Sequence, residues 1–315
     1  MSIEHLSRHY GDLKAVDAVN FDLKRGEVLG FLGPNGAGKS TTMQMITGNL
    51  APTMGKITIN GIDLLDQPKL AKAEIGYLPE QPPLYIELSV EEYLVFCAKI
   101  NGINRASQST AINRAIDRCG LGEVKSRLIS NLSKGYQQRV GIAQAIIHNP
   151  SIVILDEPTV GLDPIQIREI RKLIRELGNE HSVILSTHIL PEVQMTCDRV
   201  QIINKGQLVF SDSIECLNQS MQATSLIAQF ETSPSIDALK AIKNVESIED
   251  LGNNRLRIHY TESPAKQVAI EAVNANWGLT ELSPEQKSLE QIFVEITSSE
   301  RSPELISESD KEDAA

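Results

Sequence analysis

The stretch FLGPNGAGKSTTMQM, residues 31–45, constrains the fold of this chain more than any other feature. Gly33 and Gly38 enclose four residues ahead of Lys39 and Ser40, which matches the phosphate-binding pattern GxxxxGK[ST]. This pattern is meaningful only between a strand and a helix. The flanking segments meet that condition, because EVLGFL reads as a strand and KSTTMQMITGNL has helical spacing. The sequence therefore predicts an α/β domain with a phosphate-binding loop.

The residue types of this loop suit the chemistry of a nucleotide. Glycines let backbone amides curl around phosphate oxygens, and the positive end of the following helix faces the same anion. Lys39 can reach the β and γ phosphates, and the hydroxyl of Ser40 or Thr41 can ligate Mg²⁺. We expect the nucleotide to bind to the loop residues Gly33, Pro34, Asn35, Gly36, Ala37, Gly38, Lys39, Ser40 and Thr41.

A second motif, SIVILDEP at residues 151–158, supplies two carboxylates. The apolar run is typical of a strand buried on both faces of a parallel sheet, as is SVILSTH at residues 182–188. The segment 164–177 between them is long enough to be the crossover helix. Such a strand would bring Asp156 beside the loop as a ligand of Mg²⁺ or its water. Glu157 would then orient or deprotonate a water aimed at the γ phosphate.

These two motifs fit a kinase, a GTPase or many other nucleotide hydrolases. A third motif, LSKGYQQRV at residues 132–140, narrows the choice. Ser133 and Gly135 lie where a turn meets a helix, so a short hydroxyl and a glycine precede the helical residues. This combination predicts a second helix N-terminus that can receive an anion.

With this motif the sequence resembles the ATP-binding subunits of ABC transporters, over residues 1–217. LSKGYQQ is similar to the LSGGQ signature of that family, with Lys134 in place of the first glycine and Tyr136 in place of the glutamine. The resemblance implies that two ATPase domains pack head to tail. ATP bound by one domain would then be covered by Ser133 and Gly135 of the other, so one chain could not complete its own site.

Further residues match the family in its order along the chain. The resemblance implies that Tyr10 stacks on adenine, that Asp163 in GLDP couples the two sites, and that His188 contacts the γ phosphate. In IGYLPEQPPLY, Glu80 stands where the family usually has a glutamine that senses Mg²⁺, and Gln81 follows it. Either residue can serve, and alignment to GYLP favours Glu80 as a metal ligand.

The resemblance implies a P-loop NTPase fold of the ABC ATPase type: a RecA-like parallel sheet, an antiparallel β subdomain and a helical insertion at about 86–135. After the ATPase domain at 1–217, the segment 218–297 has the order βαββαβ with an added helix, which predicts a small α+β domain, possibly ferredoxin-like in topology. Residues 298–315 hold six acidic and two basic residues with little to bury, so we expect an acidic disordered tail.

The ending KSLEQIFVEIT, together with Glu80 and LSKGYQQRV, is similar to the ATPases of ABC-2 type exporters, including the multidrug and gliding-motility types. This resemblance implies ATP hydrolysis coupled to export through a separate integral membrane permease. It also implies a second ATPase subunit, by expectation in a homodimer, at the cytoplasmic face of the inner membrane. No uninterrupted apolar segment reaches about 18 residues, so the chain is not expected to enter a membrane by itself.

Two other functions agree less well with the sequence. A soluble ABC-type ATPase acting on a non-membrane macromolecule would usually have two sets of motifs or a basic face. This chain has one set and a net charge of −11 with no basic patch, which also argues against nucleic acid as a partner. A nucleotide-regulated binding module with weak hydrolysis would lack the base, whereas Glu157 is present.

Overall fold

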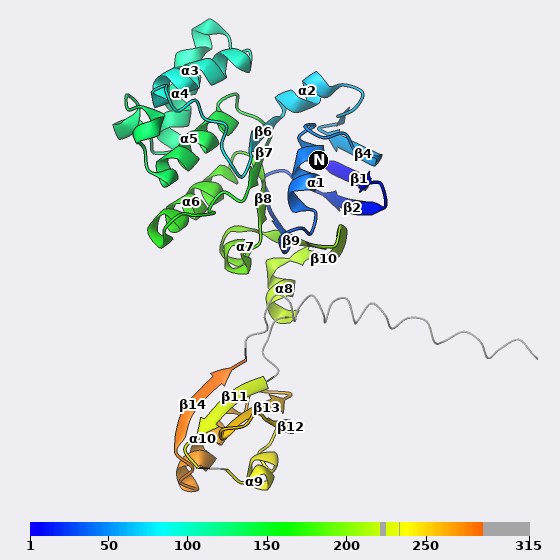
Figure 1. Cartoon of the computed structure of the whole chain (residues 1–315), viewed down its shortest axis with the longest axis vertical. Coiled ribbons are helices and arrows are strands. Elements are labelled where there is room, and N and C mark those ends of the chain that lie inside the picture. Colours follow the sequence, from blue (N-terminus) through cyan, green and yellow to red (C-terminus); the bar gives the residue numbers. More distant parts are fainter. Residues whose placement is uncertain (221–224, 233, 286–315) are drawn as a thin grey trace, which may run out of the picture. The chain divides into compact units, whose positions relative to one another are not determined.

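The computed structural model describes residues 1–220, 225–232 and 234–285 (Figure 1). These residues form two compact units, which divide between Ile214 and Glu215. Each unit has its own hydrophobic core. The helix expected at 288–297 and the tail expected at 298–315 lie outside the described residues.

The first unit is built on a six-stranded sheet. Its members in spatial order are β10 (Gln207–Ser213), β9 (Arg199–Asn204), β3 (Val28–Leu32), β8 (Ser182–Thr187), β7 (Ile152–Asp156) and β6 (Ile75–Leu78). Neighbouring strands are parallel, except that β10 runs antiparallel to β9. Every residue of β3, β7 and β8 is buried, which explains their continuous apolar runs. The predicted parallel core is confirmed.

A second, antiparallel sheet lies beside this core. Its strands in spatial order are β2 (Leu13–Asp22), β1 (Ser2–Tyr10), β4 (Met54–Ile59) and β5 (Ile62–Asp63). Helix α1 (Lys39–Ile46) shares one hydrophobic cluster with both sheets, because Met43 of the helix is buried together with Phe31 of β3 and Ile57 of β4. The short helix α2 (Pro68–Ala73) follows β5.

The predicted helical insertion is also present. It contains α3 (Val90–Ile100), α4 (Arg105–Arg118) and two short 3₁₀ turns (Gly122–Val124 and Ile129–Asn131). Helix α5 (Lys134–Ile146) begins where the predicted insertion ends and leads back to β7. Helix α3 begins at a capping box, in which Ser89 and Glu92 satisfy each other's backbone N–H groups. The hydroxyl of Tyr93 donates to the carbonyl of Pro83 at 3.0 Å, which fixes the Pro-rich segment against this helix.

Helix α6 (Pro164–Leu177) connects β7 to β8 as expected, and α7 (Leu190–Thr196) follows β8. Helix α1 lies on one side of the parallel sheet, and α5 and α6 lie on the other (Figure 1). Helix α8 (Ile214–Ser220) follows β10 and begins at the boundary between the two units. Among the described residues, no helix combines the length and the apolar composition required to cross a bilayer.

The second unit contains one sheet with the order β12 (Val245–Asp250), β13 (Arg255–Tyr260), β11 (Ser225–Phe230) and β14 (Leu279–Pro284). All neighbouring strands are antiparallel. This strand order, with antiparallel neighbours, is that of a split βαβ, ferredoxin-like unit. Helices α9 (Ile236–Lys240) and α10 (Ala265–Asn274) complete it. Trp277 packs edge-on against Phe230 in its core, with ring centroids 5.9 Å apart.

Gly76 of β6 offers a test of how closely α5 packs on the sheet. A Cβ at this position would overlap the backbone carbonyl of Ala145. We expect Gly76→Ala to lower the free energy of unfolding by about 1–3 kcal/mol, the usual cost of overpacking, in denaturant titrations. Gly122→Ala is the matched control, since nothing lies within 4 Å of its Cβ. Equal stability of the two variants would contradict this packing.

Candidate active site

The ends of three parallel strands position the candidate site. Asp156 of β7 is in register with Ser186 of β8, and Leu32 of β3 is in register with Thr187 of β8. The phosphate-binding loop follows β3, the DEP motif follows β7, and His188 follows β8. These residues, far apart in the sequence, therefore meet at one edge of the sheet.

The phosphate-binding loop is tightly packed at its base. A Cβ on Gly33 would lie 2.4 Å from the carbonyl oxygen of Ile203, and Gly38 has a φ of 108°, which glycine adopts readily. The buried Lys39 donates from Nζ to the carbonyl of Gly33 at 2.9 Å and to that of Pro34 at 3.3 Å. The loop thus fixes its cation at the N-terminus of α1.

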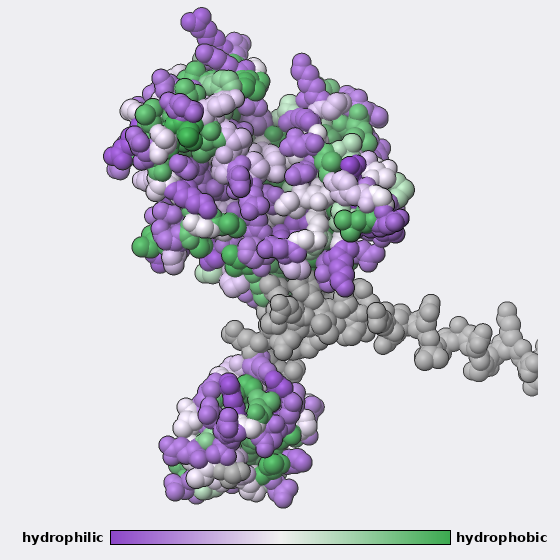
Figure 2. Space-filling view, in the orientation of Figure 1, coloured by the Kyte–Doolittle hydropathy of each residue, from purple (hydrophilic) through white to green (hydrophobic). Residues whose placement is uncertain are grey.

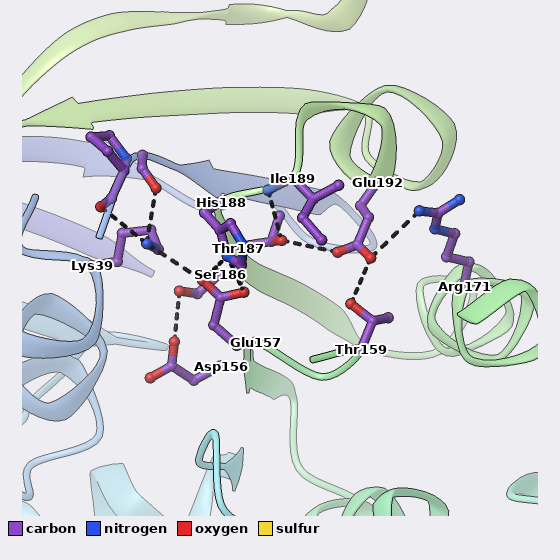
Figure 3. A network of polar contacts seen from close by, with 12 residues as sticks. Lys39, Asp156, Glu157, Thr159, Arg171, Ser186, Thr187, His188, Ile189 and Glu192 are labelled. Atoms are coloured by element: carbon purple, nitrogen blue, oxygen red, sulfur yellow. Dashed lines mark hydrogen bonds and ion pairs between the residues drawn. The ribbon is translucent and has the colours of Figure 1, made fainter. Parts of the chain in front are cut away.

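Glu157 lies between this cation and a histidine (Figure 3). One carboxylate oxygen is 3.4 Å from Lys39 Nζ, and the other is 2.9 Å from His188 Nδ1. The residue has a φ of 49°, in the left-handed region that side chains other than glycine rarely adopt. Its N–H donates to the carbonyl of Ser186 at 2.8 Å. The strand end therefore turns sharply and directs this carboxylate toward the loop.

Asp156 is only 2% exposed, and its carboxylate accepts a hydrogen bond from Ser186 Oγ at 2.7 Å. Burial raises the pKa of Asp156 above its ordinary value, although hydrogen bonds from Ser186 and Ser40 oppose the rise. A buried carboxylate beside the Ser40 hydroxyl presents hard oxygen ligands, which fit Mg²⁺. The described residues contain no cluster of three or more acidic, His or Cys side chains able to hold a metal. Such an ion would therefore need phosphate oxygens as well.

A cavity of about 730 Å³, a size typical of ligand sites, opens at this edge. Its lining includes predicted site residues from four segments: Asn35, Gly36, Gly38, Lys39, Ser40, Thr41, Glu80, Glu157 and His188. Glu80 lines the cavity, whereas its neighbour Gln81 is exposed outside the lining. The lining also includes residues that sequence reasoning missed, namely Leu13, Lys14, Ala15, Val160, Lys205 and Gly206.

The β9–β10 turn enters the site through Lys205 and Gly206, which both have positive φ. The Gly206 N–H donates to the carbonyl of Ala37 at 2.9 Å, and its carbonyl accepts from the N–H of Asp17 at 2.8 Å. The turn therefore joins the phosphate-binding loop to β2. The sequence contains one signal for this turn, Gly206 between two apolar segments, because two-residue hairpin turns need positive φ values that glycine adopts readily.

Eight predicted site residues lie outside the lining of this cavity as described. Four of them, Gly33, Pro34, Ala37 and Asp156, belong to the phosphate-binding loop or to the end of β7. The remaining four belong to other segments. Tyr10 is 47% exposed at the end of β1, and the Arg8 guanidinium lies 4.6 Å from the centre of its ring. Ser133 is exposed at the N-cap of α5 and accepts from the Tyr136 N–H at 3.4 Å. The other two are Gly135, against the side chain of Gln166, and Asp163, the N-cap of α6.

Transfer of a phosphoryl group to water requires little covalent chemistry from a protein. It requires a positioned cation and a carboxylate that orients water near the γ phosphate. At the edge of this sheet, a strand, glycine loop and helix bring the Lys39 ammonium to 3.4 Å from the Glu157 carboxylate. Fold and site together define an ATPase of the P-loop class.

Comparison with known proteins identifies the branch of this class. The family model described as ABC transporter matches residues 16–160. The uncharacterized ABC transporter ATP-binding protein YxlF of Bacillus subtilis is 31% identical over 94% of this chain and 99% of its own length. The linearmycin resistance ATP-binding protein LnrL of the same organism is 30% identical over 94% of this chain and 98% of its own length.

A solved structure titled as the ATP binding subunit of an ABC transporter matches with a TM-score of 0.62. It is 33% identical and covers 69% of this chain and 91% of its own. The chain belongs to the family of ABC transporter ATP-binding proteins, so the predicted family, fold class and ATPase activity are confirmed.

Lys39→Ala tests the phosphate-binding loop. Removing the ammonium deletes the charged donor for the β and γ phosphates, so we expect the Kd for ATP to rise by roughly 100-fold. Isothermal titration calorimetry measures this change. Lys56→Ala is the control, because it removes the same charge from an exposed ion pair with Asp63. Normal ATP affinity in Lys39→Ala would contradict the assignment of this loop to nucleotide binding.

Proposed function

We propose that this chain is the ATP-binding and ATP-hydrolysing subunit of an ABC transporter that moves its substrate, by export, through a separate membrane permease. The observation that carries the proposal is that the predicted site residues of one chain do not all line the same cavity. Lys39, Glu157 and His188 converge on one cavity, while Ser133, the signature serine, is exposed outside the cavity lining. A second copy of the chain can supply that residue.

In the proposed reaction, water attacks the γ phosphate of ATP. Glu157 orients or deprotonates this water, and His188 holds the carboxylate through the contact at 2.9 Å. Lys39 binds the β and γ phosphates. Asp156, Ser40 and Glu80 would hold Mg²⁺, which supplies positive charge against the phosphate oxygens.

The proposed mechanical cycle follows from where ATP would be bound. ATP would bind between the phosphate-binding loop of one protomer and the N-terminus of α5 in the other. It would favour the closed dimer, because one protomer alone makes fewer contacts with the nucleotide. Hydrolysis removes the γ phosphate and with it that preference. Differential affinity for the closed and open states is what allows a bound nucleotide to do work on a partner.

The helical lobe offers a surface for the permease. Figure 2 shows hydrophobic side chains gathered over the region of α3 to α5. Tyr85 and Phe96 are 50% and 36% exposed there, and their rings pack edge-on at 5.1 Å. Tyr85 lies only five residues after Glu80, which lines the nucleotide cavity. A partner bound at Tyr85 could therefore influence the cavity through this Pro-rich segment.

The names of relatives support export without identifying the substrate. The linearmycin resistance protein LnrL matches almost its whole length to this chain. Removal of a toxic compound from the cell is the simplest meaning of resistance, so we propose that this subunit acts with a permease at the cytoplasmic face of the inner membrane. The second unit, which the cavity does not include as described, is proposed to be an accessory domain.

Glu157→Gln tests the base and the dimer together. The amide cannot accept the proton of water, so we expect kcat to fall by about 10²–10⁴-fold with ATP binding retained. Because hydrolysis no longer opens the pair, the variant should accumulate as a dimer when ATP is present. Size-exclusion chromatography with light scattering measures this dimer. Glu246→Gln, at an exposed position in β12, is the control. Normal turnover in Glu157→Gln would transfer the base role to another group.

A cross-linking experiment tests the position of the signature serine within that dimer. Chains carrying Glu157→Gln with Ser133→Cys are mixed with chains carrying Glu157→Gln with Asn35→Cys. ATP should promote a disulfide between the two chains, and a mixture that lacks Asn35→Cys controls for the native cysteines. An ATP-dependent dimer with no such cross-link would contradict the head-to-tail arrangement.

Phe96→Ala tests the permease surface. Where the neighbouring open reading frame encodes a polytopic membrane protein, the chain is co-expressed with it. The ATPase activity of the complex in lipid vesicles is compared with that of the chain alone. We expect roughly a tenfold loss of permease stimulation, since a large apolar contact disappears. Met54→Ala, which shortens an exposed side chain of β4, is the control. Equal stimulation of both variants would exclude this surface.

A further inference from the structure

Glu192 of α7 is a buried carboxylate that the reaction described above does not use. It is only 1% exposed, and it does not line the nucleotide cavity as described. Burying a charge is costly unless it is paired and hydrogen-bonded. Its environment should therefore explain why a carboxylate, rather than an apolar side chain, occupies this position.

Three donors from three segments satisfy Glu192 (Figure 3). Oε1 accepts from Thr159 Oγ1 at 2.5 Å and from an Arg171 guanidinium nitrogen at 3.4 Å, and Oε2 accepts from Thr187 Oγ1 at 2.9 Å. Both threonine residues are also buried. Glu192 thus joins the turn after β7, the end of β8 and helix α6 at one point.

Both threonines adjoin the reacting groups. Thr159 lies two residues after Glu157 in the chain, and Thr187 immediately precedes His188. The Thr187 hydroxyl also accepts from the Ile189 N–H at 3.1 Å, so it fixes the backbone on either side of the histidine. The bonds to Glu192 therefore hold the two segments that carry the Glu157–His188 pair.

The backbone at Glu157 makes such support necessary. The φ of Glu157 lies in the left-handed region, which is strained for a residue other than glycine and persists only where neighbouring structure enforces it. The bond from Thr159 to Glu192 fixes the chain just beyond this turn, and the bond from the Glu157 N–H to Ser186 fixes the turn itself. Loss of the first bond would let the carboxylate drift from His188.

We propose that Glu192 is a positioning residue for ATP hydrolysis, whose carboxylate sets the geometry between Glu157 and His188 through Thr159 and Thr187. It does not line the nucleotide cavity as described, so it would act through the threonines rather than on the nucleotide itself. The inference rests on the proposed role of Glu157 as the base.

Steady-state kinetics of full-length Glu192→Gln test this inference. The amide keeps the size of the side chain but loses the charge and one acceptor, so we expect kcat to fall by roughly 10- to 100-fold, with KM for ATP and the Kd for ATP within about twofold of the parent. Glu192→Asp, which keeps the charge on a shorter side chain, should recover part of this loss.

Asp198→Asn is the matched control. Asp198 pairs with Arg175 at 2.7 Å, so it also links the region of α7 to α6, but it does not contact the threonine residues. Thermal unfolding is measured for both variants. If Glu192 served only to stabilise the fold, then both variants would lose stability and both would keep their kcat at 25 °C.

A double-mutant cycle locates the effect. Thr159→Val alone should lower kcat by roughly tenfold. Thr159→Val with Glu192→Gln should be no slower than Glu192→Gln alone, because Thr159 acts only through its bond to Glu192, which Glu192→Gln already weakens. Additive losses, or a normal kcat in Glu192→Gln, would overturn the inference.

Glu157→Gln is measured in parallel, so that the positioning role of Glu192 and the base role of Glu157 are tested separately. A slow Glu157→Gln with a normal Glu192→Gln would overturn only the positioning role. A normal Glu157→Gln would overturn the proposed function of the base, and the positioning role with it.

Discussion

The parallel pairing of β3, β7 and β8 is the constraint on which the site depends. Parallel strands carry their following segments to one edge of the sheet, so the phosphate-binding loop, Glu157 and His188 meet without being close in sequence. The register places Asp156 opposite Ser186, and the hydrogen bond between their side chains follows directly. A shift of one residue would direct these side chains to opposite faces.

Most of the first unit could be predicted because its signals are local. The loop pattern requires a strand before it and a helix after it, and β3 and α1 are found there. The apolar runs ending in Asp156 and Thr187 are wholly buried, and the crossover helix has the bounds Pro164–Leu177 that its sequence indicated. In each case a short segment carries enough hydrophobic periodicity to define its own environment.

The parts that could not be predicted depend on contacts between distant segments. Nothing in the sequence of α7 distinguishes Glu192 from an ordinary surface glutamate, since its burial arises from where Thr159 and Thr187 lie in space. The surroundings of Tyr10 could not be predicted either. The family resemblance specifies the residue type but not the Arg8 side chain over its ring. Long-range side-chain arrangements of this kind require the fold.

The β9–β10 hairpin has a consequence for how the chain can change. Short surface turns usually accept extra residues at little cost. Here the N–H and carbonyl of Gly206 are both committed, to Ala37 and Asp17, and a Cβ at this position would lie 2.9 Å from two backbone oxygens. An insertion would therefore displace the nucleotide loop itself. The length of this hairpin is therefore set by its bonds to the phosphate-binding loop and to β2, and not only by the strands that it connects.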